Sequence, residues 1–176
     1  MDLARRITIG ITTRDRWAEL SATVNRLVEI GLGDIPVVLV DDGSAEAKAE
    51  QICRPLKSCT VVRTATSLGL VEQRNRLAAM AGTDYLVSLD DDSCFEEPYN
   101  LEKAVQYMDA NAVVAVLAFW VVETRLEQSR PTTRKDVKPC LPVPVREYTG
   151  CGHMLRLQTF GCNQPPATPF CGIVAG

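Results

Sequence analysis

Short apolar segments rich in β-branched residues alternate along the chain with segments whose apolar residues recur at helical spacing. The strand segments are continuously apolar, which is typical of parallel strands buried on both faces. The alternation therefore predicts an α/β fold, a mostly parallel sheet with helices on both faces. We predict strands at 7–12, 37–40, 60–63, 85–89 and 112–122, and helices at 17–28, 45–52, 70–81 and 101–108, the last capped by Asn100.

The pattern becomes weaker after residue 122. Residues 127–144 are rich in Pro, Thr and charged residues and predict a loop. Short strands are predicted at 145–149 and 154–157, on either side of a glycine-rich segment. No charged residue follows Arg156, so we treat residues 158–176 as an atypical uncharged tail.

Composition narrows the class of protein. The chain has 176 residues, of which 46% are hydrophobic and 23% charged, as expected for one folded domain. The net charge of -3 gives no basic field that would attract nucleic acid. We find no secretory signal and no apolar run long enough to span a membrane. The seven cysteines are irregularly spaced, which favours a reducing compartment and makes the cytoplasm the expected location.

Acidic residues follow two of the predicted strands. Asp41 and Asp42 follow the second strand, and Asp90, Asp91 and Asp92 follow the fourth. In a parallel sheet the carboxyl ends of neighbouring strands line the ligand crevice, so these five carboxylates can converge on one cleft. They would repel one another unless the cleft holds Mg²⁺, Mn²⁺ or the donor groups of a nucleotide. Residues 41–44 can alternatively form a turn that caps a helix.

The order of these motifs resembles that of family 2 glycosyltransferases, which have the GT-A fold. The resemblance covers residues 7–157. It includes Gly150-Cys151-Gly152, which is similar to the small-residue segment that opens the acceptor half of the family. The motifs that carry it are Thr12-Thr13-Arg14-Asp15-Arg16, Asp41-Asp42-Gly43-Ser44, Gly69 through Arg74-Asn75, and Leu89-Asp90-Asp91-Asp92.

The resemblance implies a role for six of these residues. Thr12 and Asp42 would contact the base, and Arg74 would approach the nucleotide from the third predicted helix. Asp90 and Asp91 would hold the ribose and organise water. Asp92, the last acid of the DxD motif, would bind Mn²⁺ or Mg²⁺, which stabilises the negative charge on the leaving phosphates. For Arg74, a surface salt bridge to a nearby acid is an equally good interpretation.

The same resemblance implies inverting transfer of a sugar from a nucleotide diphosphate donor to a sugar, lipid or protein acceptor. Residues 1–126 would form the nucleotide-sugar-binding region, and residues 127–157 a loop and the start of the acceptor region. The chain would then be the N-terminal portion of such an enzyme, with a truncated or altered C-terminus. Peripheral contact with a membrane and the oligomeric state stay open.

An inverting transferase needs a general base near the acceptor hydroxyl. The family places an acidic residue beyond the small-residue segment, whereas this chain has no acid after Glu147. Glu147 and His153, the one histidine, are weak substitutes. We therefore leave the catalytic base unassigned.

Three other interpretations follow from the residues. One is a noncatalytic nucleotide-sugar-binding module, which the missing base motivates. Another is a nucleotidyltransferase, although Ser67-Leu68-Gly69 matches its glycine-rich basic loop poorly. The third is a zinc site, which we reject because the spacing fits no compact set of ligands; its members would be Cys140, Cys151, His153, Cys162 and Cys171.

Overall fold

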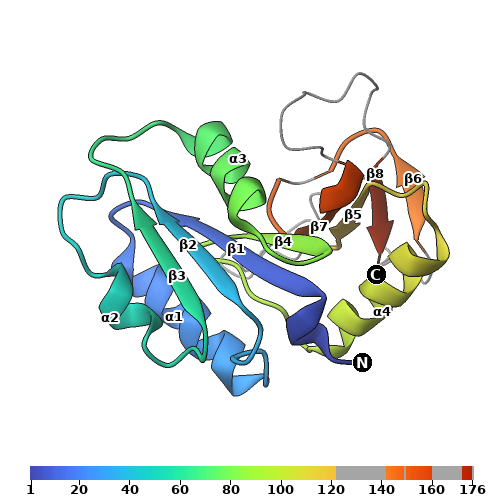
Figure 1. Cartoon of the computed structure of the whole chain (residues 1–176), viewed down its shortest axis with the longest axis horizontal. Coiled ribbons are helices and arrows are strands. Elements are labelled where there is room, and N and C mark those ends of the chain that lie inside the picture. The colour runs from blue at the N-terminus through green and yellow to red at the C-terminus, as the bar shows by residue number, and fades with distance from the viewer. Residues whose placement is uncertain (122–141, 149, 160–171, 176) are drawn as a thin grey trace, which may run out of the picture.

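The computed structural model describes residues 1–121, 142–148, 150–159 and 172–175 (Figure 1). Its strands are β1 Ile7–Thr13, β2 Val37–Asp41, β3 Cys59–Arg63, β4 Tyr85–Asp90, β5 Val116–Phe119, β6 Val143–Val145, β7 His153–Arg156 and β8 Gly172–Ala175. Its helices are α1 Trp17–Glu29, α2 Ala49–Cys53, α3 Leu70–Met80 and α4 Tyr99–Ala110, with 3₁₀ turns η1 Leu3–Arg5 and η2 Leu157–Thr159.

The described strands form one sheet with the order β3-β2-β1-β4-β7-β5-β8-β6. Strands β3, β2, β1 and β4 are parallel neighbours, and β5 is parallel to β8. Two strands run the other way: β7 is antiparallel to both β4 and β5, and β6 is antiparallel to β8. The predicted α/β fold with a mostly parallel sheet is therefore confirmed.

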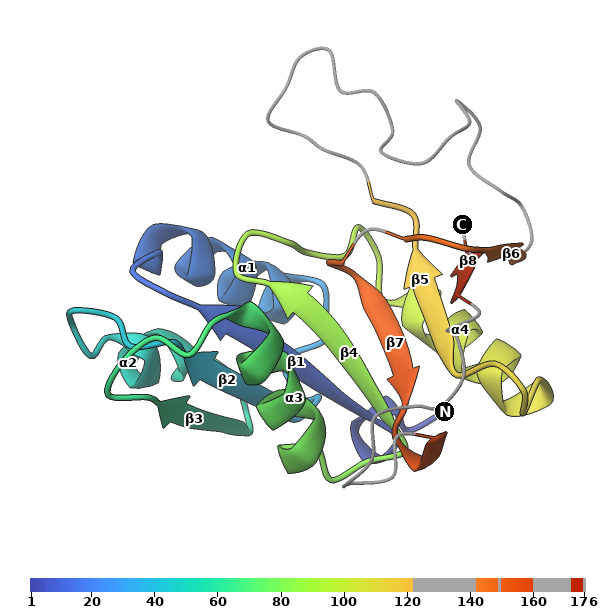
Figure 2. The ribbon, with the colours of Figure 1, turned by 90° about the horizontal axis from the view of Figure 1, so that it is seen from above.

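Helices cover both faces of the sheet, as predicted (Figure 2). Helices α1, α2 and α4 pack on one face, where alternate strand residues such as Ile9, Leu39 and Val87 form the main core. Helix α3 packs on the other face against Val40 and Leu86. Because strand side chains alternate between faces, successive strand residues are directed either to the main core or to the face that α3 covers.

Helices α2 and α4 begin at different residues from those predicted. Helix α2 starts at Ala49 rather than 45, since Asp15 and Asp41 bind the backbone amides of Ala45 and Ser44. Helix α4 starts at Tyr99, directly after Pro98, so the assignment of Asn100 as its cap was wrong. Proline favours the start of a helix because it has no N–H to satisfy.

The strands after α4 also differ from their predicted bounds. The predicted strand 112–122 is reduced to β5, and Val113 before it is almost fully exposed. Strand β6 lies at Val143–Val145 instead of 145–149, whereas β7 is within one residue of its prediction. Strand β8, in the tail, was missed. The domain boundary predicted after residue 126 falls in segment 122–141, which lies outside the described residues. The boundary predicted after residue 157 stays a prediction.

Candidate functional site

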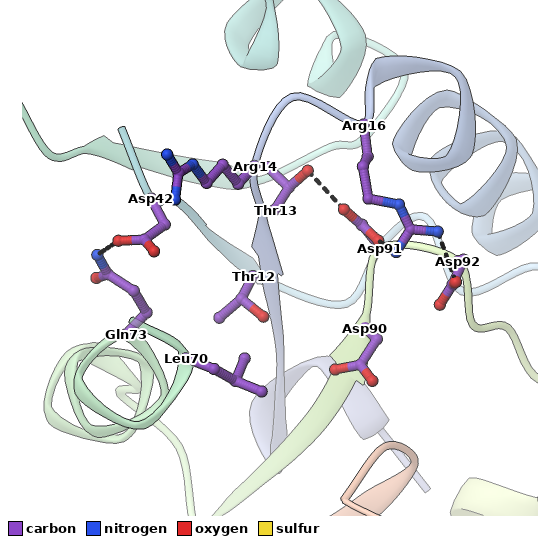
Figure 3. Close-up of a pocket in the computed structure, with 10 residues that line it drawn as sticks. All are labelled: Thr12, Thr13, Arg14, Arg16, Asp42, Leu70, Gln73, Asp90, Asp91 and Asp92. Atoms are coloured by element: carbon purple, nitrogen blue, oxygen red, sulfur yellow. Dashed lines mark hydrogen bonds and ion pairs between the residues drawn. The ribbon is translucent and has the colours of Figure 1, made fainter. Parts of the chain in front are cut away.

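A cavity of about 350 Å³ opens at the carboxyl ends of β1, β2 and β4 (Figure 3). Strand register places Thr12 of β1 directly beside Asp90 of β4. Asp42 and Gln73 lie on one side of the cavity and Asp91 and Asp92 on the other, with Thr12 between them. The residues that line it are Thr12, Thr13, Arg14, Arg16, Asp42, Leu70, Gln73, Asp90, Asp91 and Asp92.

Asp91 is more deeply buried than the other acids that line the cavity. Its carboxylate accepts a hydrogen bond of 2.8 Å from the Thr13 hydroxyl and forms an ion pair of 2.9 Å with Arg16. Its carbonyl oxygen accepts a further bond from the Thr23 hydroxyl on α1. Burial raises the pKa of Asp91, while Thr13 and Arg16 act in the opposite direction. The pKa of Asp91 is raised on balance, and Arg16 supplies a positive charge that opposes this effect of burial.

Arg16 also reaches the neighbouring acid. Its second guanidinium nitrogen lies 2.7 Å from Asp92, and this hydrogen bond is the main reason why the pKa of Arg16 is raised. The sequence interpretation looked for compensation of these acids in a metal ion or a nucleotide, whereas Arg16 of the protein itself pairs with two of them. The turn between β1 and α1 brings a cation to the carboxylates that follow β4.

Asp90 is paired with the third helix. Arg74 of α3 donates a bond of 2.7 Å to its carboxylate. Gly150 lies against this arginine, and a Cβ atom there would come within 3.1 Å of the guanidinium. Arg74 is not among the residues that line the cavity, so it reaches the site through Asp90. This salt bridge matches the alternative interpretation of Arg74.

Asp42 is held by four donors from the segment that begins α3. The Ser67 hydroxyl, the amides of Leu68 and Gly69, and the Gln73 side chain all donate to its carboxylate. Burial alone would raise the pKa of Asp42, but these hydrogen bonds outweigh it and lower the pKa to about 2. Asp42 is therefore ionised, with its acceptor positions filled.

Asp41 does not belong to the cavity. Its side chain is fully buried and accepts bonds from the amide and hydroxyl of Ser44, and Arg63 lies 3.3 Å away. Asp41 thus makes the turn that we considered for segment 41–44. The prediction that five carboxylates meet was wrong, since four of them line the cavity.

The sequence interpretation gave no role to Arg16 or Gln73. Arg16 lies within a quoted motif at the carboxyl end of β1, so its position at the ligand edge of the sheet could have identified it. Gln73 is fully buried on α3, where nothing in the sequence indicates that its amide reaches Asp42.

The two weak candidates for the general base are not among the residues that line the cavity. His153 is buried on β7, beside Ser88 of β4, and its ring contacts Tyr148 edge to face. Burial, and then the charge of Arg74, lowers the pKa of His153 to about 4, so the imidazole is uncharged at neutral pH. Glu147 is exposed. Neither residue lines the cavity.

The cavity fits a hard divalent cation only in part. Asp92 offers a partly exposed carboxylate oxygen, the kind of ligand that Mg²⁺ and Mn²⁺ prefer. Among the described residues no group of three His, Cys, Asp or Glu side chains could hold a metal ion. The protein would therefore supply a partial set of ligands, and phosphate and water oxygens would complete it. Of the cysteines considered for zinc, Cys140, Cys162 and Cys171 lie outside the described residues.

Comparisons with known sequences agree with one another. The family model described as "Glycosyl transferase family 2" matches residues 8–173. An uncharacterized glycosyltransferase of Haemophilus influenzae is 32% identical over 105 residues, which are 60% of this chain and 35% of that protein.

In the part of the chain that the structure describes, no helix is long and apolar enough to cross a membrane.

Solved structures with a similar fold include the following two. The mannosyltransferase PcManGT from Pyrobaculum calidifontis, in complex with GDP-Man and Mn²⁺, has a TM-score of 0.57 and 20% identity, covering 68% of this chain and 36% of that one. S. aureus TarS 1-349 in complex with UDP-GlcNAc has a TM-score of 0.66 and 17% identity, covering 88% and 46%. The chain thus spans less than half the length of these proteins.

Proposed function

We propose that the cavity binds a nucleotide diphosphate sugar, since this chain belongs to glycosyltransferase family 2 and has the GT-A fold. In the full reaction the sugar is transferred with inversion to an acceptor hydroxyl, assisted by Mn²⁺ or Mg²⁺. The observation that carries the proposal is the group of Asp90, Asp91 and Asp92 at the end of β4, facing Thr12 and Asp42 across one cavity. The two similar structures were solved with GDP-Man and with UDP-GlcNAc, which supports a donor of this class.

The nucleoside would lie between the two sides of the cavity. Thr12 and Asp42 are placed to contact the base, and Asp90 to contact the ribose. Because four donors already fill the Asp42 carboxylate, a base N–H must replace one of them. The Gly69 amide, at 3.2 Å, makes the longest of the four bonds and is the first we expect to be released. Arg74 would act by orienting Asp90.

The diphosphate would lie toward Asp92. A bound divalent ion would supply Lewis-acid stabilisation of the charge that develops on the leaving phosphates. Asp92 would hold it, and Asp91 would orient Arg16 and water at the same end. Arg14 also lines the cavity, and its side chain extends toward Asp42, so it would add positive charge on the base side (Figure 3).

The general base decides between catalysis and binding alone. His153 is buried and uncharged and Glu147 is exposed, so the described part of the acceptor side offers no carboxylate near the cavity. This observation keeps a second candidate, a noncatalytic nucleotide-sugar-binding module. The family model gives no support to the nucleotidyltransferase alternative.

Calorimetry on the whole chain tests donor binding. We expect a uridine, guanosine or thymidine diphosphate to bind in the presence of Mn²⁺, and Asp92→Asn to weaken that binding at least tenfold. Asp34→Asn is the matched control, because Asp34 is exposed and pairs with Lys57 far from the cavity. If none of the three nucleotides binds with Mn²⁺, the proposal is wrong.

A second measurement separates the two candidates. Release of nucleoside diphosphate from the donor sugar, with loss of that release in Asp92→Asn, would establish catalysis. Binding without release would establish the noncatalytic module. The acceptor class (sugar, lipid or protein), a role without nucleic acid and a cytoplasmic location are further parts of the proposal, and they rest on the sequence.

A further inference from the structure

One guanidinium links the buried acid and the outer acid at the end of β4. The two terminal nitrogens of Arg16 lie 2.9 Å from Asp91 and 2.7 Å from Asp92 (Figure 3). Arg16 is the residue directly before α1, so its side chain extends from a backbone that the helix holds in place. A planar guanidinium can bind two carboxylates at once, and a lysine cannot reproduce this geometry.

Arg16 can be replaced as a partner more easily at Asp92 than at Asp91. The Asp91 side chain is 5% exposed and is also bound by Thr13, so withdrawal of Arg16 would leave a buried charge uncompensated. The Asp92 side chain is 29% exposed and can exchange its partner for water or another cation. Arg16 is therefore anchored on Asp91 and exchangeable at Asp92.

A divalent ion at Asp92 would meet Arg16 at the same carboxylate. Two cations within a few ångströms repel each other, and at the edge of a cavity this repulsion is only partly screened. The described residues supply no complete set of metal ligands that would outweigh it. A bound diphosphate would both complete the metal's ligands and reduce the repulsion between the two cations. Its oxygens would ligate the metal, and its negative charge would accommodate Arg16 and the metal together.

We propose that Arg16 is a positioning residue that occupies Asp92 in the free protein and makes divalent-cation binding conditional on the diphosphate. This inference rests on the proposed function and adds to it an order of binding. Nucleotide and metal bind together, and the cavity does not take up the metal on its own.

Titration of Mn²⁺, followed by the electron paramagnetic resonance signal of the free ion, tests the inference without measuring activity. We expect the wild type to bind Mn²⁺ at least tenfold more tightly with a saturating nucleoside diphosphate than without one. Arg16→Gln should bind Mn²⁺ without nucleotide at least tenfold more tightly than the wild type, and Asp92→Asn should abolish that gain. The difference made by nucleotide should then nearly disappear in Arg16→Gln.

Arg14→Gln is the matched control. It removes the same charge from the same cavity, but the Arg14 side chain extends toward Asp42, on the opposite side of the cavity from Asp92 (Figure 3). A general charge effect would raise Mn²⁺ affinity equally in both variants, which would overturn the inference. Arg16→Lys retains the charge but cannot bind both carboxylates at once, so its Mn²⁺ affinity without nucleotide should rise above that of the wild type. An unchanged affinity would overturn the inference, and this variant serves even if Arg16→Gln does not fold.

The experiment distinguishes failure of the inference about Arg16 from failure of the proposed function. If no nucleoside diphosphate binds, the proposed function fails, while comparison of Arg16→Gln with the wild type in Mn²⁺ alone still tests competition at Asp92. If nucleotides bind but the wild type takes up Mn²⁺ equally well without them, the inference about Arg16 is wrong and the proposed function stands.

Discussion

Asp42 shows how a single side chain joins a structural and a binding role. Its carboxylate fixes the segment before α3 through the amides of Leu68 and Gly69, and the same carboxylate lines the cavity. In each of these hydrogen bonds, the loop amide and the Asp42 carboxylate give each other a partner that burial would otherwise deny them. The site at this position is therefore built by the same hydrogen bonds that hold the loop.

We expect Asp42→Asn to lower the free energy of unfolding at neutral pH by about 1–3 kcal/mol. An asparagine amide turns one acceptor into a donor that faces the Gln73 amide or the backbone amides of Leu68 and Gly69. Urea denaturation at pH 7 measures the loss, with Asp34→Asn as the exposed control. A loss no larger than that of the control would contradict the assigned role.

The same residue predicts a dependence on pH. The pKa of Asp42 is lowered from 3.8 to about 2 in the folded protein, so its contribution to stability is present above pH 4 and is lost as the pH falls toward 2. The difference in unfolding free energy between the wild type and Asp42→Asn should shrink across this window. A difference that stays constant from pH 5 to pH 2 would show that the carboxylate is not selectively stabilised.

At the scale of elements, two loops meet beneath the cavity. Gly43, after β2, has a φ of +74°, and a Cβ atom there would lie 2.7 Å from backbone atoms of Thr66 and Ser67. Gly69, which precedes α3, has a φ of +87° with open space around it. Both positions favour glycine conformationally, but only Gly43 is also needed for the loops to approach each other.

Alanine at these two glycines should therefore have unequal effects. We expect Gly69→Ala to cost about 1–2 kcal/mol, because its φ of +87° and ψ of 158° lie in a region that essentially only glycine adopts. Gly43→Ala should cost more, about 2–4 kcal/mol, because the loop that binds Asp42 must also move. Thermal and urea unfolding measure the costs, and nucleotide affinity should fall further in Gly43→Ala. Equal losses would mean that the two loops do not pack as described.

At the scale of the whole molecule, a network around Tyr85 joins the first strands to the later ones. Arg156 of β7 donates to the Tyr85 hydroxyl and to the carbonyl oxygens of Met108, Asn111 and Val114 at and beyond the end of α4. Arg6 and the Tyr85 hydroxyl both bind Asp109. The antiparallel strand β7 is thus fastened to α4 and, through Asp109, to the start of β1.

Arg156→Ala should destabilise the fold without affecting the cavity. We expect a loss of about 2–4 kcal/mol, because charge-assisted bonds to several carbonyl groups disappear together. Nucleotide affinity should stay unchanged, since Arg156 does not line the cavity. Urea unfolding and calorimetry check the two effects, and Arg5→Ala provides an exposed control. Weakened nucleotide binding in a folded Arg156→Ala protein would show that β7 transmits strain to the site.

The sequence determined the alternation of strands and helices and the edge of the sheet that carries the acidic residues. These features follow from local periodicity, which is why β1, β2, β4, α1 and α3 lie close to their predicted bounds. The sequence predicted the elements after α4 less accurately. There the strands are short, and their pairing partners are distant in sequence.

Tertiary structure alone decided which acids serve the cavity and which cations meet them. Asp41 and Asp42 are neighbours in sequence, yet alternation along the chain and the loop before α3 direct one into a turn and the other into the cavity. Arg16 reaches Asp91 and Asp92 because β1 and β4 are adjacent in the sheet, a pairing that spans more than 70 residues. Local pattern fixes the position of a side chain on its own element, whereas its partners depend on contacts that form only when distant strands assemble.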